Sequence, residues 1–493
     1  MKNKILSASQ TKMADQFTIE NDQISSIDLM EKAANQFVNA IIPFVHGKPL
    51  IHIFCGKGNN GGDGFAVARL LKEKGALVHT YLLDSGQKLS KDCEINASCL
   101  KQYKIIDSEN DFPKIKAEDV VIDALLGSGL TRRPEGLLAA LIEFLNHSKA
   151  KILSIDIPSG LSCDELPADS SIIKAHFTGT FEFPKKSFFM KESATFLGKW
   201  QVLPIGLNQP FIQSQASDLY YLTQDFFKEI ILPREKFTNK GTYGHGLLIA
   251  GSKGKMGSAI LSAKAALRSG IGLLTAQIPS CGYVIFQSAV PEAMCETDDS
   301  IDFNTKLKVD FKNFNAIGVG PGMGNQIGTK NILTEIFTKS NLPLVIDADA
   351  LNVISEYSDL QMNLPANSIL TPHPKEFERL AGQSKNSFER LELLRNFARK
   401  TDCYIVLKDA ITTIACPDGK IFFNTTGNPG MATGGSGDVL TGIILGLLAQ
   451  GYSPLNATLI GVYFHGKAGD LASIHVGENQ IIASDLVQYF RLM

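Results

Sequence analysis

The residues best placed to do chemistry lie in the stretch 427–442, GNPGMATGGSGDVLTG. Four small residues come before an apolar, helix-like segment: Gly434, Gly435, Ser436 and Gly437. Small residues let the backbone approach a ligand closely, and a helix that begins just after them directs free N–H groups outward, so we expect an anion site. Asp438 suits the N-cap of that helix, and it could also accept a proton from a hydroxyl under phosphoryl attack. The alternative is an ordinary capped helix after a loop.

A second group of polar residues follows three apolar strands nearer the N-terminus. Each strand runs into glycines, in the segments GKGNNGGDG (56–64), DVVIDALLGSGL (119–130) and KILSIDIPSGL (151–161). The carboxyl ends of parallel strands meet at one edge of a sheet, which is where ligands bind in α/β proteins. The polar residues concerned are Asn59, Asn60, Asp63, Asp123, Asp156 and Ser159. Each alone could cap a helix or close a turn, but together they predict one site.

The elements that position both groups alternate between strand and helix along the whole chain, which predicts an α/β protein. At 493 residues and 44% hydrophobic, the chain can bury more than one core. Weak periodicity over 207–225 suggests a linker there, so we expect one domain over 1–212 and another over 225–493. A second strand–glycine–helix series begins at 245–279 and continues to the C-terminus.

Composition narrows the range of partners and locations. A net charge of −2 gives no general reason to expect nucleic acid as a partner. The eight cysteines have neither paired nor metal-ligand spacing, so we expect thiols in a reducing compartment. No uncharged apolar run approaches the ~18 residues of a membrane span, and the N-terminus lacks a signal-peptide core. We therefore expect a cytoplasmic protein that does not enter a membrane.

The first half resembles the NAD(P)H-hydrate epimerase family, over roughly residues 1–210. The resemblance lies in GKGNNGGDG, VIDALLGSG and SIDIPSG, and it implies a Rossmann-like three-layer domain. It also implies a potassium ion held by Asn60, Asp123 and Ser159, whose oxygen atoms suit a hard cation. Epimerisation needs a carboxylate that can accept and return a proton, and Asp156 is our candidate. By the same resemblance, these residues would contact the hydrated dinucleotide: Asn59, Asn60, Gly61, Gly62, Asp63, Gly127, Ser128, Gly129, Leu130, Thr131, Arg132, Arg133 and Asp156.

Residues 225–493 resemble the ADP- or ATP-dependent NAD(P)H-hydrate dehydratase family, which has a ribokinase-like α/β fold. The matching motifs, in the family's order, include GVGPGMG, VIDADALN, TPHPKEF, KDAITTI and NPGMATGGSGDVLTG. The resemblance implies a substrate site formed by Ala259, Gly322 or Gly324, His373 and Asp438. It implies that the nucleotide is held by Lys408, Asp409, Ala410, Ile411 and Thr412 together with Gly434, Gly435, Ser436 and Gly437. A magnesium ion is expected with ADP or ATP, and Met256 stands where an aromatic residue is expected.

The fused chain thus resembles the bifunctional bacterial enzymes that repair hydrated NADH and NADPH. The first domain would interconvert the R and S hydrates, and the second would phosphorylate the S hydrate so that phosphate leaves and the reduced ring is restored. Members of such families often form dimers or larger rings, so we expect a homo-oligomer. A ribokinase-like kinase for a vitamin precursor and a non-catalytic nucleotide-binding protein are the alternatives. For three residues an interpretation without a role in catalysis or binding is also open: His373 could lie in a rigid turn, Lys408 could be a solvated charge, and Asp347 could be a structural group.

Overall fold

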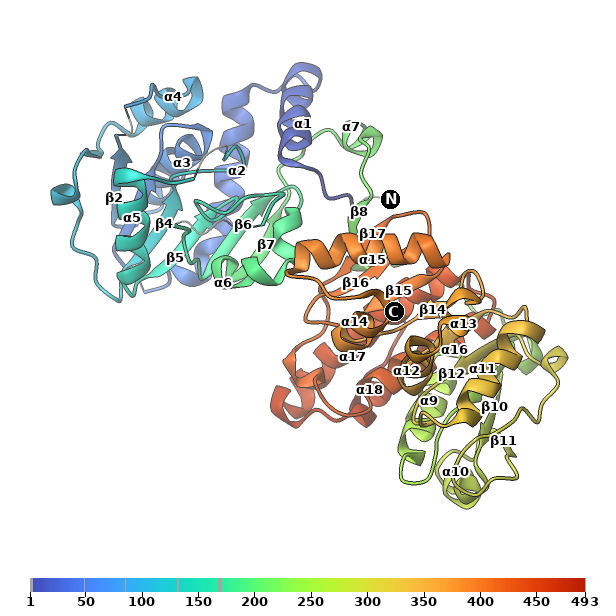
Figure 1. The fold of residues 1–493 in the computed structure, drawn as a ribbon. Coiled ribbons are helices and arrows are strands. Elements are labelled where there is room, and N and C mark those ends of the chain that lie inside the picture. Colours follow the sequence, from blue (N-terminus) through green and yellow to red (C-terminus); the bar gives the residue numbers. More distant parts are fainter. Residues whose placement is uncertain (1–2, 48, 85, 131–132, 167–170, 493) are drawn as a thin grey trace. The chain divides into compact units, whose positions relative to one another are not determined.

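The computed structural model describes residues 3–47, 49–84, 86–130, 133–166 and 171–492. The chain forms two compact units, Met1–Ser217 and Asp218–Met493 (Figure 1). Each has its own sheet, and each is described by itself below.

The first unit is built on a parallel sheet of seven strands in the order β3-β2-β1-β4-β5-β6-β7. The strands are β1 (Ile51–Cys55), β2 (Val78–Leu83), β3 (Lys104–Ile106), β4 (Val120–Ala124), β5 (Lys151–Ile155), β6 (Phe177–Phe181) and β7 (Lys199–Leu203). The strand order reverses direction between β1 and β4. In open α/β sheets, ligands bind outside the carboxyl ends of the strands at such a point.

Helices cover both faces of this sheet. Apolar residues of α2, α3 and α4 share one core with the sheet, and those of α5 share a second core on the other side. The helices are α1 (Ala8–Asn21), α2 (Ser26–Ile41), α3 (Asn59–Glu73), α4 (Lys91–Leu100), α5 (Gly136–His147), α6 (Ala194–Leu197) and α7 (Gln209–Ser214). The α/β class predicted from the alternating pattern, and the Rossmann-like three-layer arrangement that the family resemblance implies, are therefore confirmed.

The second unit contains a ten-stranded sheet in the order β11-β10-β9-β12-β13-β14-β15-β16-β17-β8. All neighbours are parallel except the pairs β15–β16 and β16–β17. The strands are β8 (Leu219–Tyr221), β9 (His245–Ile249), β10 (Leu273–Ile278), β11 (Met294–Thr297), β12 (Ala316–Val319), β13 (Leu344–Ile346), β14 (Ile369–Leu370), β15 (Tyr404–Leu407), β16 (Thr412–Ala415) and β17 (Ile421–Asn424). The polar stretch interpreted as linker thus differs in part: β8 lies within it and pairs with β17.

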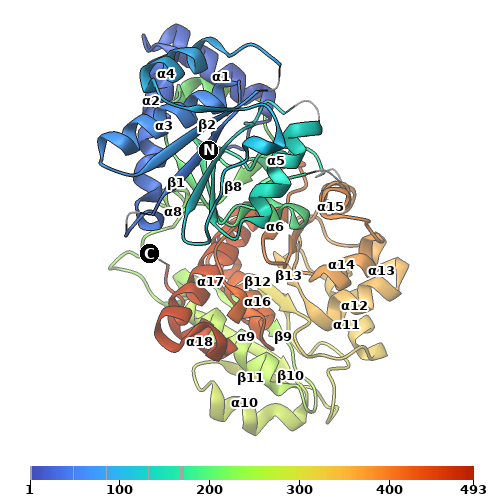
Figure 2. The same cartoon turned by 90° about the vertical axis from the view of Figure 1, so that its left-hand side faces the viewer.

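Four helices of this unit, α9, α16, α17 and α18, lie side by side and share one core with the sheet (Figure 2). The neighbouring strand residues Leu247 and Ile249 are equally buried but point to the other face, so both faces are covered. The helices are α8 (Gln224–Phe227), α9 (Met256–Arg268), α10 (Tyr283–Ala289), α11 (Ile327–Lys339), α12 (Ala348–Glu356), α13 (Ser358–Met362), α14 (Pro374–Ala381), α15 (Ser387–Thr401), α16 (Ser436–Ala449), α17 (Pro454–Val476) and α18 (Ala483–Tyr489). Among the described residues, no helix has the length and apolarity to cross a bilayer.

Candidate active sites

The glycine-rich stretch of the second unit does lead into a helix, α16, as its sequence predicts. The N-cap is Gly435, at φ 91°, a left-handed conformation that suits glycine. No side chain caps the helix. The Ser436 N–H contacts the Thr433 carbonyl at 3.4 Å, and the N–H groups that follow it in the first turn can bind an anion. The N-cap role considered for Asp438 is wrong, because Asp438 lies within the first turn.

Asp438 is a largely buried carboxylate beside this helix terminus. Burial is the main cause that raises its pKa from 3.8 to about 6, and the nearby charge of Asp347 adds to the shift. A hydrogen bond with Ser258, on the first turn of α9, and the charge of Lys408 act in the opposite direction. The backbone carbonyl of Asp438 accepts a hydrogen bond of 2.9 Å from Ser262, which fixes α16 against α9. A carboxyl with a pKa near 6 is suited to accept a proton at neutral pH.

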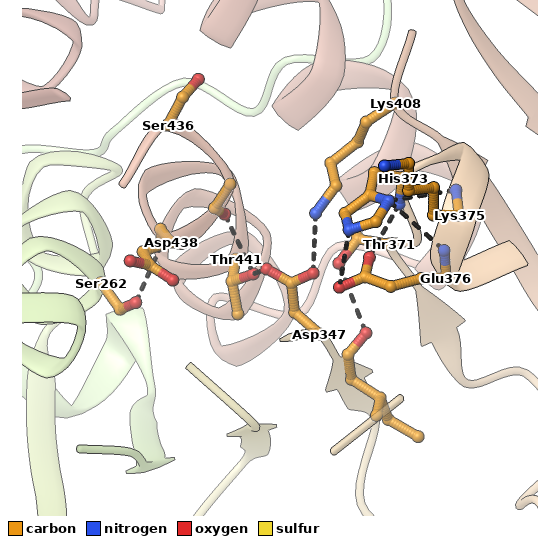
Figure 3. Close-up of polar contacts among 12 residues, drawn as sticks. Ser262, Asp347, Thr371, His373, Lys375, Glu376, Lys408, Ser436, Asp438 and Thr441 are labelled. Atoms are coloured by element: carbon orange, nitrogen blue, oxygen red, sulfur yellow. Dashed lines mark hydrogen bonds and ion pairs between the residues drawn. The ribbon is translucent and has the colours of Figure 1, made fainter. Parts of the chain in front are cut away.

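Lys408 and Asp347 form an ion pair at the ends of β15 and β13 (Figure 3). The lysine Nζ lies 2.8 Å from Asp347 Oδ1, and Thr441 of α16 donates a bond of 2.7 Å to Asp347 Oδ2. Asp347 is only 1% exposed, and these partners, Lys408 first, lower its pKa despite the opposing effect of burial. A Cβ on Gly437 would lie 3.0 Å from Lys408 Nζ. Lys408 is therefore no solvated charge, since its ammonium group is held against the first turn of α16.

The other residues expected to bind the nucleotide lie on the turn between β15 and β16. Asp409 and Ala410 are exposed, and Ile411 and Thr412 are half-buried. Arg390 of α15 pairs with Asp409 at 3.1 Å, and the Asp409 carboxylate accepts the N–H of Ala410 at 2.8 Å. This turn therefore has a defined shape, and it follows directly from Lys408.

Two glycines expected at the substrate site, Gly322 and Gly324, both have positive φ, 64° and 81°. Gly324 donates its N–H to Asp349 Oδ2 at 2.8 Å, and the same oxygen pairs with Lys255 at 3.1 Å. Ala259 is fully buried in α9, and its place at the substrate site stays a prediction. Met256 is also buried, against Gly251 and Gly282, and so takes a place in the core.

His373 is the N-cap of α14. Its Nδ1 accepts hydrogen bonds from the backbone N–H groups of Lys375 and Glu376, and Glu376 accepts the backbone N–H of His373 in return. The ring is 45% exposed and its Nε2 lies 3.4 Å from Glu376 Oε1. Burial and the charge of Lys408 lower the pKa of His373. The imidazole is thus a neutral, oriented group beside the Lys408–Asp347 pair.

In the first unit, the three expected cation ligands come together at the carboxyl edge of the sheet. Asp123 accepts hydrogen bonds from Ser159 Oγ at 2.5 Å, Ser159 N at 2.9 Å and Ser154 Oγ at 2.8 Å. Asn60 donates to the carbonyl of Leu126 at 2.8 Å, and Ser159 contacts that same carbonyl. The buried Asn60 Oδ1 has no hydrogen-bond partner. An unpaired buried oxygen beside a carboxylate, a hydroxyl and a carbonyl is a donor set that suits a hard cation.

The glycine turn after β1 differs from its prediction, because α3 already begins at Asn59 and includes Asn60, Gly61, Gly62 and Asp63. A Cβ on Gly61 would lie 1.8 Å from the carbonyl oxygen of Gly56, so only glycine permits this close turn. In the second strand–glycine turn, Gly127 packs against Asn60, whereas Thr131 and Arg132 lie outside the described residues.

Asp156 follows β5 with φ 65°, a conformation that non-glycine residues seldom adopt. Its Oδ1 lies 2.9 Å from Nζ of the buried Lys185 and accepts the N–H of Phe181 at 3.1 Å. Burial also raises the pKa of two neighbouring carboxyls, Asp15 to about 7 and Asp63 well above its usual range, and the charge of Asp156 contributes to both shifts. Strained backbone and shifted carboxyls are common at functional sites.

Several groups at these sites were not selected from the sequence: Asp15, Leu126, Lys185, Ser258, Glu376 and Thr441. Leu126, Glu376 and Thr441 lie within motifs quoted from the sequence, but no motif shows which of its residues make the contacts at the site. The burial of Lys185 is an unusual feature for a lysine, but it is apparent only in the folded structure and not in the sequence. Among the described residues, no three His, Cys, Asp or Glu side chains form a metal-binding group.

Comparison with known proteins covers both units. A family model described as "YjeF-related protein N-terminus" matches residues 26–187, and one described as "NAD(P)H-hydrate dehydratase" matches residues 246–490. The Bifunctional NAD(P)H-hydrate repair enzyme Nnr of Moorella thermoacetica is 35% identical over 505 residues, covering 98% of this chain and 95% of the relative.

Two solved structures resemble the second unit. The ADP/ATP-dependent NAD(P)H-hydrate dehydratase of Bacillus subtilis, co-crystallised with ATP/Mg²⁺, is 31% identical, with a TM-score of 0.47 over 54% of this chain and 95% of that chain. A ribokinase-like superfamily protein of Enterococcus faecalis is 29% identical, with a TM-score of 0.49 over 56% of this chain and 95% of that chain. The predicted succession of two α/β domains is confirmed. The chain belongs to the family of bifunctional NAD(P)H-hydrate repair enzymes.

Proposed function

We propose that the second unit dehydrates the S form of hydrated NADH and NADPH, with Asp438 as the general base. The hydroxyl on the reduced ring is a poor leaving group until a nucleotide donates a phosphoryl group to it. Asp438 would accept the hydroxyl proton as the oxygen attacks phosphorus. The ring nitrogen then expels phosphate and restores the dihydropyridine. The observation that most supports this proposal is the position of Asp438. It is a carboxyl with a pKa of about 6, in the first turn of a helix that has no side-chain cap.

Charge on the transferring phosphoryl group would be stabilised by the N-terminus of α16 and by Lys408. The N–H of Gly437 belongs to the first turn of α16, and Lys408 lies against Gly437, whereas the N–H of Ser436 contacts the Thr433 carbonyl at 3.4 Å. Asp409 to Thr412 would form the adjoining wall of the nucleotide site. The hydrated ring would be faced by Ala259, Gly322 or Gly324, His373 and Asp438. These assignments rest on the shared carboxyl edge of the sheet and on the contacts of Lys408.

We propose that ADP or ATP enters with a magnesium ion. Mg²⁺ usually keeps several waters and binds through one or two carboxylates plus the phosphates. That habit agrees with the lack of a compact ligand group among the described residues. When bound, the ion would neutralise charge between phosphate oxygens.

We propose that the first unit interconverts the R and S hydrates and holds potassium at Asn60, Asp123 and Ser159. The unpartnered Asn60 Oδ1 and the nearby Leu126 carbonyl support this assignment. The hydrated dinucleotide would lie along Asn59 to Asp63, the loop from Gly127 to Arg133, and Asp156. Interconversion requires either loss and return of hydroxide or ring opening and closure. Asp156 would accept and return the proton in both routes.

Two further predictions concern the whole protein: that it assembles into a homo-oligomer, and that it is located in the cytoplasm. Sedimentation of the purified chain would measure the first, and fractionation of the source cells would measure the second.

The function is tested by incubating the protein with purified hydrated NADH and either ADP or ATP. Recovery of the absorbance of the reduced nicotinamide ring, with release of phosphate, is the expected result. A vitamin-precursor kinase would consume nucleotide only with its own alcohol substrate and would leave that absorbance unchanged. Absence of recovery with both nucleotides would contradict the proposal.

A further inference from the structure

Lys185 is one of the largest fully buried side chains in the protein, at 1% exposure. A buried ammonium group is costly unless it is paired, because it loses its hydration. Its only charged partner within ion-pair distance, among the described residues, is Asp156, 2.9 Å away. The ammonium group also contacts Phe183, whose carbonyl lies at 3.4 Å and whose ring centroid lies at 5.5 Å. The ion pair with Asp156 therefore offsets much of the cost of burying the Lys185 charge.

Asp156 is held by three donors, all on the same oxygen. Lys185 Nζ, the Phe181 N–H at 3.1 Å and the Thr180 hydroxyl at 3.3 Å all contact Oδ1. The Asp156 N–H is fixed in turn by the Gly179 carbonyl at 2.8 Å. No described residue donates a hydrogen bond to Oδ2. One oxygen is thus used to orient the carboxylate, and the other is left for a ligand.

We propose that Lys185 is a positioning residue that keeps Asp156, rather than its neighbouring carboxyls, as the charged group of the epimerisation site. The inference rests on the proposed function of Asp156. Lys185 does not contact substrate in this account; it acts on the reaction through the charge and orientation of Asp156.

The surrounding carboxyl groups explain why a residue that favours the charged form of Asp156 is needed. Asp15 of α1 and Asp63 of α3 face Asp156, and burial favours the neutral form of both, with pKa values of about 7 and well above the usual range. The other titratable groups that influence this cluster are Asp92 of α4, Cys163 and Asp164 after β5, and Glu182 after β6. Burial alone lowers the pKa of Lys185, but the charge of Asp156, with smaller contributions from Cys163 and Asp15, raises it overall. The cluster thus contains several carboxyls and one buried cation, and the cation is placed on Asp156.

The test compares Lys185→Met, Lys185→Arg and Asp156→Asn in the full-length chain, by following conversion of pure R hydrate into S hydrate across pH. In Lys185→Met, the acid limb of the epimerisation profile should move up by about one to three pH units, the range for loss of an adjacent opposite charge. Its rate should therefore fall relative to the parent protein on the acid side of the profile and recover at higher pH. Lys185→Arg, which keeps the charge, should leave the acid limb in place.

Dehydration of supplied S hydrate by the second unit serves as the folding control in the same molecule, and Lys174→Met provides a matched change at an exposed lysine of the first unit. An unmoved acid limb and normal rate in Lys185→Met, with activity lost in Asp156→Asn, would overturn the inference but keep the function of Asp156. If Lys185→Met does not fold, a displaced acid limb in Lys185→Arg would overturn it. Normal epimerisation in Asp156→Asn would instead contradict the proposed function itself.

Discussion

The two units use a lysine–carboxylate ion pair in different ways. Each has a lysine paired with a buried carboxylate at the carboxyl edge of its sheet: the fully buried Lys185 with Asp156, and the partly exposed Lys408 with Asp347. In the first unit the paired carboxylate has one oxygen to which no described residue donates, and it is our candidate for proton transfer. In the second, both oxygens of Asp347 are engaged, and the candidate base is the separate Asp438. An ion pair alone therefore does not identify a reactive carboxylate, since the same pairing occurs at Asp347, which has both oxygens engaged.

The largest effect is expected at Asp438. Replacement by asparagine keeps the shape of the side chain but removes the base, so dehydration should fall by roughly 10²–10⁴. Epimerisation of R to S hydrate by the same chain should be unchanged, and it reports that the protein is folded. Near-normal dehydration by Asp438→Asn, measured by ring absorbance, would remove this residue from the mechanism.

Lys408→Met should destabilise the second unit, because it leaves Asp347 buried without its cation. Loss of one partner of a buried pair costs about 3–5 kcal/mol, and the 23% exposure of the Lys408 side chain favours the lower end, about 3 kcal/mol. Urea unfolding of the full chain measures the change. The double variant Asp347→Asn/Lys408→Met should recover much of the loss; equal destabilisation of both variants would argue against the pair as its source.

Asp123→Asn should impair the proposed potassium site of the first unit without affecting the second unit. The change keeps the side-chain shape but removes the one negative charge among the proposed potassium ligands. Epimerisation should fall roughly tenfold to a hundredfold and lose its response to added potassium, as when groups that hold a metal are replaced. Dehydration should continue. A potassium response as strong as in the parent protein would place the cation elsewhere.

The pH dependence of dehydration should sharpen the contrast between the units. Burial raises the pKa of Asp438 to about 6, and a base acts in its ionised form, so the rate should be full above pH 6. Below that value it should fall about tenfold per pH unit as the carboxyl takes up a proton. The profile is read with saturating nucleotide and S hydrate. A rate that stays constant down to pH 4 would mean that another group accepts the proton.

Much of the fold follows from local patterns. Apolar strands that run into glycine turns are correctly placed after β1, β4 and β5, and the approach of Asp438 to a helix terminus is readable from four small residues and an apolar run. The start of α3 is misjudged, because NNGGDG has poor helix propensity, whereas packing against the Gly56 turn requires those glycines within the helix. The strand β8 is missed because only its pairing with β17 defines it.

The contacts that tune the sites are beyond local patterns. Lys408 and Asp347 are 61 residues apart in the chain, and Asn60 meets the carbonyl of Leu126 from 66 residues away. Neither burial of a charge nor its partner can be read from such separations. Asp15 and Lys185 show the same limit: their importance arises when α1 and the segment after β6 are brought beside Asp156.

One measurement tests the central claim of two separate sites most directly: recovery of reduced-ring absorbance from pure R and pure S hydrate, with nucleotide, by Asp156→Asn and Asp438→Asn. We expect Asp156→Asn to restore the ring from the S hydrate but not from the R hydrate, and Asp438→Asn to restore it from neither while still interconverting them. Recovery from R hydrate by Asp156→Asn, or loss of both reactions in either folded variant, would contradict the account.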